Sequence, residues 1–159
     1  MIMSEMQDRI NLLGPHFIQA IQEVIATMSG MTVTEINDCS NSGVDGEISS
    51  AMVLVGEKNM LATISMPQET AALLVSYMTG TPIGKITPEE LYDGVAELVN
   101  MVAGQVKTFV GATPYRFQLT SPFVIVGKSY SIVHKNQVTT FWKCFETSGL
   151  KLQLKIYFL

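Results

Sequence analysis

Cysteine and histidine are scarce in this chain of 159 residues, which contains only two of each. The cysteines, Cys39 and Cys144, lie far apart, and neither has a second cysteine or a histidine at the spacing of metal ligands. The pattern therefore does not indicate a metal site. We expect both thiols to be reduced, in or near the core of a cytoplasmic protein.

Charged residues are also few, at 15% of the chain, and the ten lysines and arginines are scattered rather than gathered in a basic run. A nucleic-acid surface needs clustered basic residues, so we expect no binding to DNA or RNA. The first nine residues have no continuous apolar segment of the kind found in secretory signals, and no stretch is long enough to span a bilayer. We therefore expect no membrane association.

Apolar residues make up 47% of the sequence, which is typical of a globular protein with a substantial core. A chain of this length can bury such a core without disulfides or a structural metal. The simplest organisation is one domain over residues 1–159.

Periodicity predicts helices that alternate with groups of strands. A first helix covers residues 3–28, where Gly14-Pro15 suggests a kink or a fresh start, and a cluster of turn residues occupies 41–46. Two further helices cover 67–80 and 87–111. Strands are predicted at 32–39, 48–55, 59–66, 117–126, 130–134, 138–145 and 150–158. The predicted fold is α/β (α+β), with a sheet covered by helices.

This element order suggests an internal duplication of a unit made of one helix and three strands. Gln19, Glu23, Ala26 and Gly30 have the same spacing as Asp93, Glu97, Asn100 and Gly104. Four matching positions are weak evidence for a sequence repeat. Alanine stands in the first copy where asparagine stands in the second, so whether the first helix keeps a functional role is left open.

The start and the two faces of the third helix are well marked. Thr87-Pro88-Glu89-Glu90 is a capping box with proline at the first helical position, and Gly111 is the expected end. With about 100° of rotation per residue, Asp93, Glu97, Asn100 and Gly104 fall within roughly 60° of one another. The predicted buried face opposite them consists of Leu91, Val95, Leu98, Val102, Val106 and Phe109.

An exposed Glu-x-x-Asn pair is most often a solvated helix face without chemistry. Two features favour a functional surface here. Small residues flank the pair, namely Gly94, Ala96, Ala103 and Gly104, and the face has few lysines and arginines. Small flanking residues would let the backbone of a partner come close.

The motif resembles that of the CheC, CheX and FliY family of chemotaxis phosphatases, and most closely its single-site CheX type. The family signature is Asp or Ser, then Glu four residues later, Asn three residues after that, and a later proline. Here these residues are Asp93, Glu97, Asn100 and Pro122. Pro122 comes one residue earlier than the family spacing. The resemblance extends over most of the chain.

The resemblance implies a CheC-like fold and removal of phosphate from an aspartate on a CheY-type response regulator. It also implies that Asn100 positions the attacking water and that Glu97 contacts the active-site lysine of the regulator. The chain itself has no glycine-rich phosphate loop, no cysteine nucleophile beside a basic loop and no carboxylate cluster at metal spacing. We therefore expect it to bind no cofactor, and the implied Mg²⁺ and the phospho-aspartate to belong to the regulator.

Five further residues are candidates for docking the regulator: Asp93, Gly104, Tyr92, Met101 and Lys107. Asp93 is also explained by the helix dipole, and Lys107 by simple solvation.

The alternative function is a non-catalytic adaptor of the same fold that binds a response regulator or a flagellar switch component. A third interpretation is a dimer-forming protein with no regulator partner. Because related CheX proteins form dimers, a homodimer is also possible.

Overall fold

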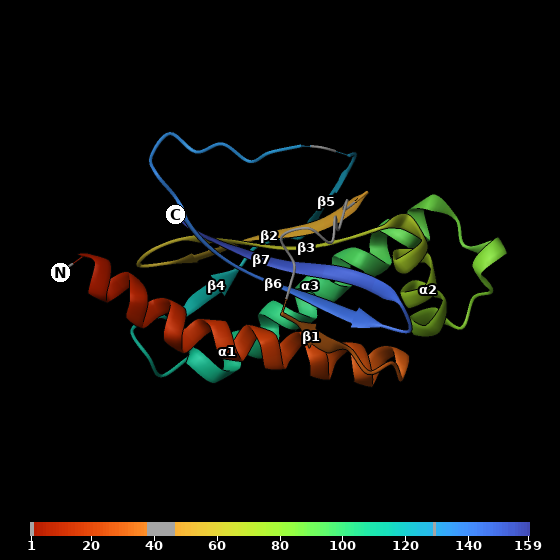
Figure 1. Cartoon of the computed structure of the whole chain (residues 1–159), viewed down its shortest axis with the longest axis horizontal. Coiled ribbons are helices and arrows are strands. Elements are labelled where there is room, and N and C mark those ends of the chain that lie inside the picture. Colours follow the sequence, from red (N-terminus) through yellow and green to blue (C-terminus); the bar gives the residue numbers. More distant parts are fainter. Residues whose placement is uncertain (1, 38–46, 129) are drawn as a thin grey trace.

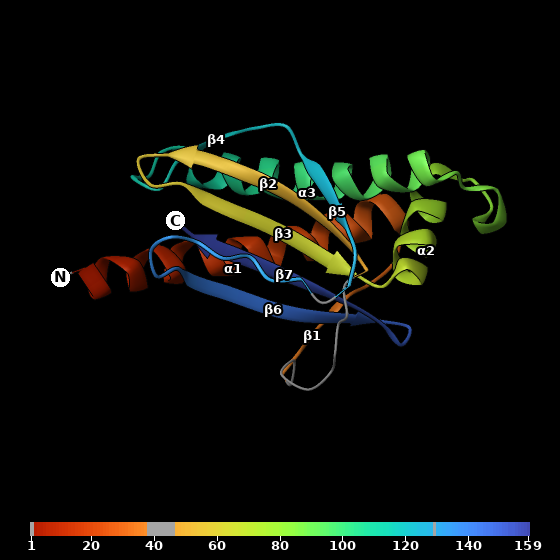
Figure 2. The same cartoon turned by 90° about the horizontal axis from the view of Figure 1, so that it is seen from above.

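Two long helices lie on one face of a seven-stranded antiparallel sheet, as the computed structural model shows (Figures 1 and 2). The structure describes residues 2–37, 47–128 and 130–159. The strand order is β1-β6-β7-β3-β2-β4, and β5 also pairs with β2. In Figure 2, α3 lies beside the edge formed by β2, β4 and β5, whereas α1 lies behind β7.

The predicted element order is found, and the fold class is confirmed. The elements are α1 (Ile2–Ser29), β1 (Thr34–Ile36), β2 (Ile48–Gly56), β3 (Met60–Met66), α2 (Gln68–Thr79), the 3₁₀ turn η1 (Ile83–Lys85), α3 (Pro88–Val110), β4 (Phe117–Leu119), β5 (Phe123–Val126), β6 (Thr139–Thr147) and β7 (Leu150–Phe158).

Two details of the helices and turns differ from the prediction or cannot be compared with it. Helix α1 continues through Pro15, so Gly14-Pro15 does not begin a new helix. The predicted turn cluster at 41–46 and the last two residues of the predicted 32–39 strand lie outside the described residues.

The predicted strand at 117–126 is divided into β4 and β5. Between them the hydroxyl of Thr120 donates a hydrogen bond to the carbonyl oxygen of Val53 at 2.6 Å, and Pro122 has no backbone N–H to offer. Both features interrupt a regular ladder with β2. The chain therefore leaves the β2 edge briefly and rejoins it at Phe123.

The predicted strand at 130–134 is wrong, because these residues form no regular element. They belong to a connection that crosses the face of the sheet opposite the helices (Figures 1 and 2). The hydroxyl of Tyr130 is hydrogen-bonded to the hydroxyl of Ser49 on β2. The residue pattern was strand-like, but a side-chain contact replaces the backbone ladder here.

The sheet order reveals the duplicated architecture. Exchanging β1 with the β4–β5 edge, β2 with β6, and β3 with β7 reproduces the same order in reverse. Strands β3 and β7 pair at the centre, from Met60 opposite Phe158 to Ser65 opposite Gln153. Helices α1 and α3 are the corresponding helices of the two units. The duplication suggested by the element order, with support from four helix positions, is therefore present in the topology.

Helix α3 buries one whole side in the core. The buried residues of α3 are Leu91, Gly94, Val95, Leu98, Val99, Val102, Ala103, Val106 and Val110. Phe109 was predicted to belong to this side, but it is 46% exposed. Its ring instead stacks on the ring of His16 in α1, with centroids 5.0 Å apart. The helix ends one residue later, at the buried Val110.

Cys144 on β6 is buried as predicted, but it is disulfide-bonded. The prediction of a reduced thiol is therefore wrong for Cys144. Cys39 lies outside the described residues.

Across the described ranges, no helix has both the length and the hydropathy needed to cross a membrane.

Gly94 gives a direct test of how closely α2 and α3 pack. A Cβ atom added at Gly94 would lie 2.5 Å from Cγ2 of Val75, a buried β-branched side chain that has no room to move away. We expect Gly94→Ala to lower the free energy of unfolding by about 1–3 kcal/mol, measured by urea denaturation.

The matched control is Gly84→Ala, since an added Cβ there has no atom within 4 Å. We expect this change to stay within about 0.5 kcal/mol of the parent. Equal stability of the two variants would contradict the proposed close contact between α2 and α3.

Candidate functional site

The helix that carries the candidate site is fixed at its N-terminus by the predicted capping box. The backbone N–H of Glu90 donates to Oγ1 of Thr87 at 3.1 Å, and the backbone N–H of Thr87 donates to a carboxylate oxygen of Glu90 at 3.4 Å. Pro88 is the first helical residue. Because the cap and the buried side both hold α3, the orientation of its outer face is set within the monomer.

The outer face presents the four residues predicted from the helical spacing, which we call the α3 stripe: Asp93, Glu97, Asn100 and Gly104. Asp93 and Glu97 are exposed, whereas Asn100 and Gly104 are half-buried. Among the described residues, the side chains of Asp93, Glu97 and Asn100 have no hydrogen-bond or ion-pair partner. The stripe therefore carries two carboxylates and one carboxamide whose hydrogen-bonding capacity is unused within the protein.

One flank of the stripe is formed by the end of β4. The side chain of Leu119 lies 3.9 Å from the position that a Cβ at Gly104 would occupy. Leu119 precedes Pro122 by three residues, so the segment carrying this proline runs near the stripe. The family signature includes Pro122, but no sequence pattern indicated Leu119, because its contact with Gly104 joins residues that only the tertiary fold brings together.

The small residues around the stripe have two different roles. Gly94 and Ala103 are buried, and Gly94 allows the close approach of Val75 in α2. These two residues therefore serve packing inside the protein, not the approach of a partner, which corrects the interpretation from sequence. Ala96 and Gly104 are half-buried and remain part of the outer surface.

The other predicted docking residues border the stripe. Tyr92, Met101 and Lys107 are all half-buried. Tyr92 and Met101 also pack against the edge of the hydrophobic core, which restricts their motion. They would offer a partner apolar surface that is already positioned.

The equivalent surface of α1 is arranged differently. The carboxylate of Glu23, which corresponds to Glu97, accepts a hydrogen bond from Nε2 of Gln19 at 2.8 Å and another from Nε2 of Gln105 at 2.5 Å. Ala26 occupies the position that corresponds to Asn100. The first unit thus lacks the carboxamide, and its carboxylate links α1 to α3. Sequence spacing did not reveal this link.

A metal site is not evident in the part of the chain that the structure describes. No group of three or more His, Cys, Asp or Glu side chains there is placed to hold a metal ion.

Comparisons with known proteins agree with this architecture. The family model described as chemotaxis phosphatase CheX matches residues 48–146, more than half of the chain. A comparison with curated proteins gives no match.

Several solved structures share the fold. The chemotaxis protein CheX from Vibrio vulnificus is 24% identical with a TM-score of 0.79, covering 95% of this chain and 98% of that one. A chemotactic CheC-like protein from Shewanella oneidensis is 28% identical with a TM-score of 0.77, covering 94% and 99%.

A CheX–CheY–BeF3–Mg²⁺ complex from Borrelia burgdorferi also matches, at 20% identity and a TM-score of 0.74, covering 90% of this chain and 95% of that chain. The matched family model extends over β2 to β6 and includes the whole of α3 with its stripe. This chain belongs to the CheX family of chemotaxis phosphatases.

Proposed function

We propose that this chain hydrolyses the phospho-aspartate of a CheY-type response regulator, with Asn100 and Glu97 as its catalytic residues. The observation that carries the proposal is the α3 stripe, in which Asp93, Glu97 and Asn100 have no partner among the described residues. The stripe lies on a helix whose opposite side is buried. Membership of the CheX family and the Borrelia complex of CheX with CheY support the choice of partner.

Asn100 would orient the water that attacks phosphorus. In this reaction the water oxygen bonds to phosphorus, the bond from phosphorus to the aspartate oxygen breaks, and the electron pair stays on the aspartate carboxylate. Inorganic phosphate is released. The transition state of phosphoryl transfer is loose, so catalysis depends mainly on alignment and charge stabilisation. A carboxamide suits this role because it donates and accepts hydrogen bonds without a charge that would repel the phosphoryl group.

Glu97 would set the register of the complex. A carboxylate close to phosphate would be repelled, but the same carboxylate paired with the active-site lysine of the regulator is an attractive contact. Glu97 lies one helical turn before Asn100, so this pairing would fix the carboxamide beside the phospho-aspartate.

The regulator would provide the remaining chemistry. Mg²⁺ bound to the regulator would stabilise negative charge on the phosphoryl oxygens, and this chain would contribute the water-orienting group from outside. Mg²⁺ is part of the Borrelia CheX–CheY complex. Because the regulator would supply the metal ion and the phospho-aspartate, this chain would need only a few polar side chains on its catalytic surface.

The docking surface would extend from the stripe to its borders. Asp93 and Gly104 belong to the stripe itself, whereas Tyr92, Met101 and Lys107 surround it. Residues 1–159 would act as one phosphatase domain, and the reaction would take place in the cytoplasm with its regulator.

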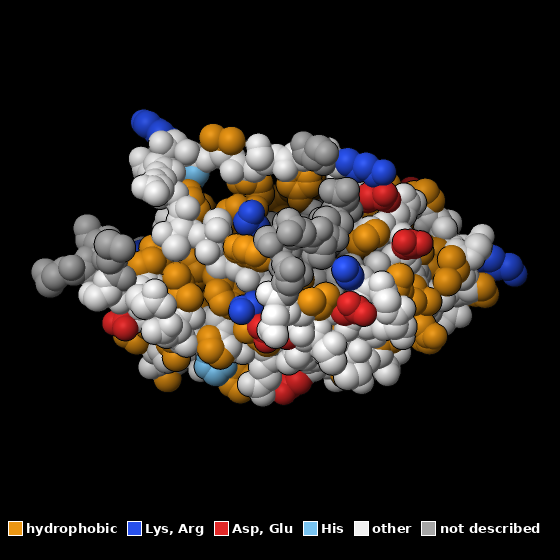
Figure 3. All heavy atoms as spheres, in the orientation of Figure 1, with side chains coloured by type: hydrophobic (Ala, Val, Ile, Leu, Met, Phe, Trp, Pro, Cys, Tyr) orange, Lys and Arg blue, Asp and Glu red, His pale blue; other side chains and the backbone are white. Residues whose placement is uncertain are grey.

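A homodimer is part of the proposal. Well-exposed apolar residues of the C-terminal half include Phe123 (46%), Val126 (58%), Val133 (86%) and Trp142 (41%). The connection that contains Val133 arches over the sheet, and apolar side chains are visible in the hollow below it (Figure 3). Burial of this surface between two copies would remove apolar area from water.

Sedimentation equilibrium tests the dimer. We expect a species of twice the chain mass of 17.4 kDa. A single species of 17.4 kDa at all concentrations would show that this surface does not join two copies.

Asn100→Ala tests the catalytic assignment. We expect this change to reduce the acceleration of phospho-regulator decay by about 10²-fold, because the water loses its orienting group. Binding to the regulator should change little. The assay follows the decay of a phosphorylated receiver domain with and without the protein.

Asn11→Ala is the matched control, since Asn11 is an exposed asparagine on the other long helix. It should leave decay as fast as with the parent. If Asn100→Ala accelerates decay as well as the parent does, Asn100 has no catalytic role.

Glu97→Gln tests the docking contact separately. Loss of the charge should weaken binding to the receiver domain about tenfold, or about 1.4 kcal/mol. Binding is measured by isothermal titration of the receiver domain. Glu23→Gln is the control, because Glu23 occupies the equivalent position in α1 and is engaged by Gln19 and Gln105. Equal affinities for both variants would argue against the lysine contact.

The same two assays separate the alternatives. An adaptor would bind the receiver domain without changing the lifetime of its phosphate. A protein without a regulator partner would show no binding at all. Either result with the parent chain would overturn the phosphatase proposal.

A further inference from the structure

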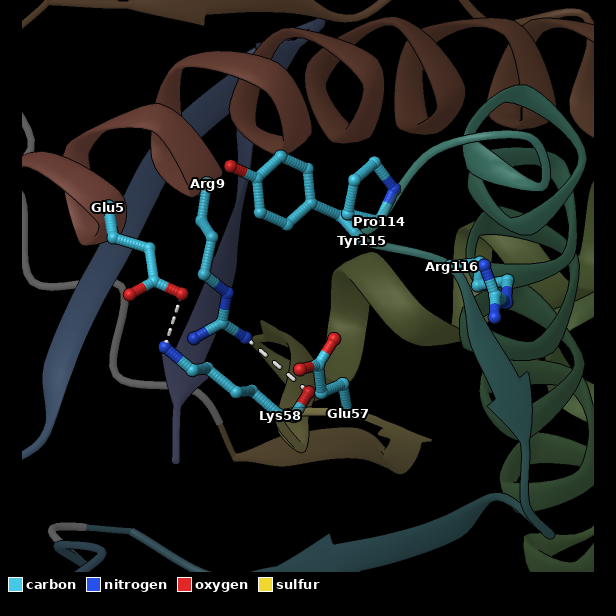
Figure 4. A pocket seen from close by; sticks show the side chains of 7 residues that line it. All are labelled: Glu5, Arg9, Glu57, Lys58, Pro114, Tyr115 and Arg116. Carbon is cyan, nitrogen blue, oxygen red and sulfur yellow. Dashed lines mark hydrogen bonds and ion pairs between the residues drawn. The ribbon is translucent and has the colours of Figure 1, made fainter.

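A small pocket opens at the end of the molecule where α1 begins, at the β2–β3 turn and the α3–β4 connection (Figure 4). Its volume is about 120 Å³, enough for a ligand of only a few heavy atoms. The pocket is lined by Glu5, Arg9, Glu57, Lys58, Pro114, Tyr115 and Arg116. None of these residues belongs to the α3 stripe or its borders.

Arg9 is the central residue of this pocket, as Figure 4 shows. It is only 2% exposed. One of its terminal nitrogens, Nη2, donates to the carbonyl oxygen of Lys58 across a long 3.5 Å, and the guanidinium carbon lies 4.9 Å from the centre of the Phe158 ring. The other terminal nitrogen, Nη1, is buried and has no hydrogen-bond partner among the described residues.

Such an arrangement is costly for a buried cation. A guanidinium removed from water needs hydrogen-bond acceptors or an opposite charge to compensate for the lost hydration. Burial lowers the pKa of Arg9, whereas the negative charge of Glu5 raises it. The ring of Phe158 supplies part of the compensation, but Nη1 still lacks an acceptor. An anion bound against the guanidinium in the pocket would supply the missing negative charge.

The charges around the pocket indicate what kind of anion fits. Arg9, Lys58 and Arg116 are positive and Glu5 and Glu57 are negative, which leaves one positive charge in a chain whose net charge is −4. Glu5 is already paired with Lys58 at 2.6 Å, and this hydrogen bond lowers the pKa of the Glu5 carboxyl. A single negative charge would neutralise the pocket, whereas a dianion would exceed it. A planar carboxylate also matches the geometry of a guanidinium.

We propose that this pocket is a binding site for a small monocarboxylate, with the guanidinium of Arg9 as the principal donor to the carboxylate oxygens. Arg116 and Lys58, at the rim, attract the anion. Glu57 is exposed and has no partner among the described residues. We expect its negative charge to oppose binding of the anion.

The test is a titration of the ¹⁵N-labelled protein with sodium acetate, at constant ionic strength maintained with sodium chloride, followed by two-dimensional NMR. We expect saturable shifts of the Arg9 side-chain signal and of the Lys58 and Tyr115 amides. Chloride alone should not produce them. Inorganic phosphate, largely a dianion at pH 7.5 or above, should bind at least threefold more weakly than acetate.

Variants assign the binding to Arg9. Arg9→Met should weaken acetate binding at least tenfold, whereas Arg116→Met, which changes the only other arginine, should weaken it less than threefold. Glu57→Gln should tighten binding, because a negative charge that repels the anion is removed from the pocket lining.

The proposal is overturned if the shifts do not saturate, if chloride reproduces them, or if Arg9→Met binds acetate as well as the parent does. If Arg9→Met does not fold, the Arg9 side-chain signal of the parent protein decides the question. An Arg9 signal that does not move while other residues respond would rule out the site. None of these measurements depends on phosphatase activity, so the result stands apart from the proposed function.

Discussion

The burial of one side of α3 is the constraint on which the candidate site depends. Leu98, Val102 and Val106 lie in the core, and the glycine at 94 lets α2 approach within contact distance. A helix held in this way cannot rotate, because rotation would bring buried valines into water and polar side chains into the core. The direction in which Asn100 points is therefore determined by packing on the opposite side of the helix.

The two halves of the protein share a topology but have diverged at corresponding positions. In α3 the carboxylate of Glu97 has no partner in the part of the chain that the structure describes, whereas in α1 the carboxylate of Glu23 accepts hydrogen bonds from Gln19 and Gln105. A carboxylate engaged within its own protein must break those bonds before it can contact a partner. The second unit is thus suited to recognition, and the first unit contributes a link that holds α3 in place.

Local patterns predicted the elements better than the contacts between them. The capping box at Thr87 and the 3.6-residue periodicity located α3, since both signals lie within the helix itself. The strand predicted at 130–134 was wrong, because Tyr130 contacts Ser49 through side chains, which residue alternation does not encode. The packing role of Gly94 was also missed, since it depends on Val75 in another helix. The spacing predicted the outward face of the stripe, but the roles proposed for Asn100 and Glu97 come from the family resemblance.

Unpaired polar groups have different consequences at the surface and in the interior. Glu97 is hydrated in the free protein, so leaving it without a protein partner costs little, and the side chain stays available for docking. Nη1 of Arg9 is buried, so its lack of an acceptor among the described residues costs free energy, and an anion beside the guanidinium would offset part of that cost. Occupation of the pocket would therefore stabilise the fold, whereas docking at the stripe would chiefly select a partner. Because the two surfaces share no residue, each can be changed without altering the contacts of the other.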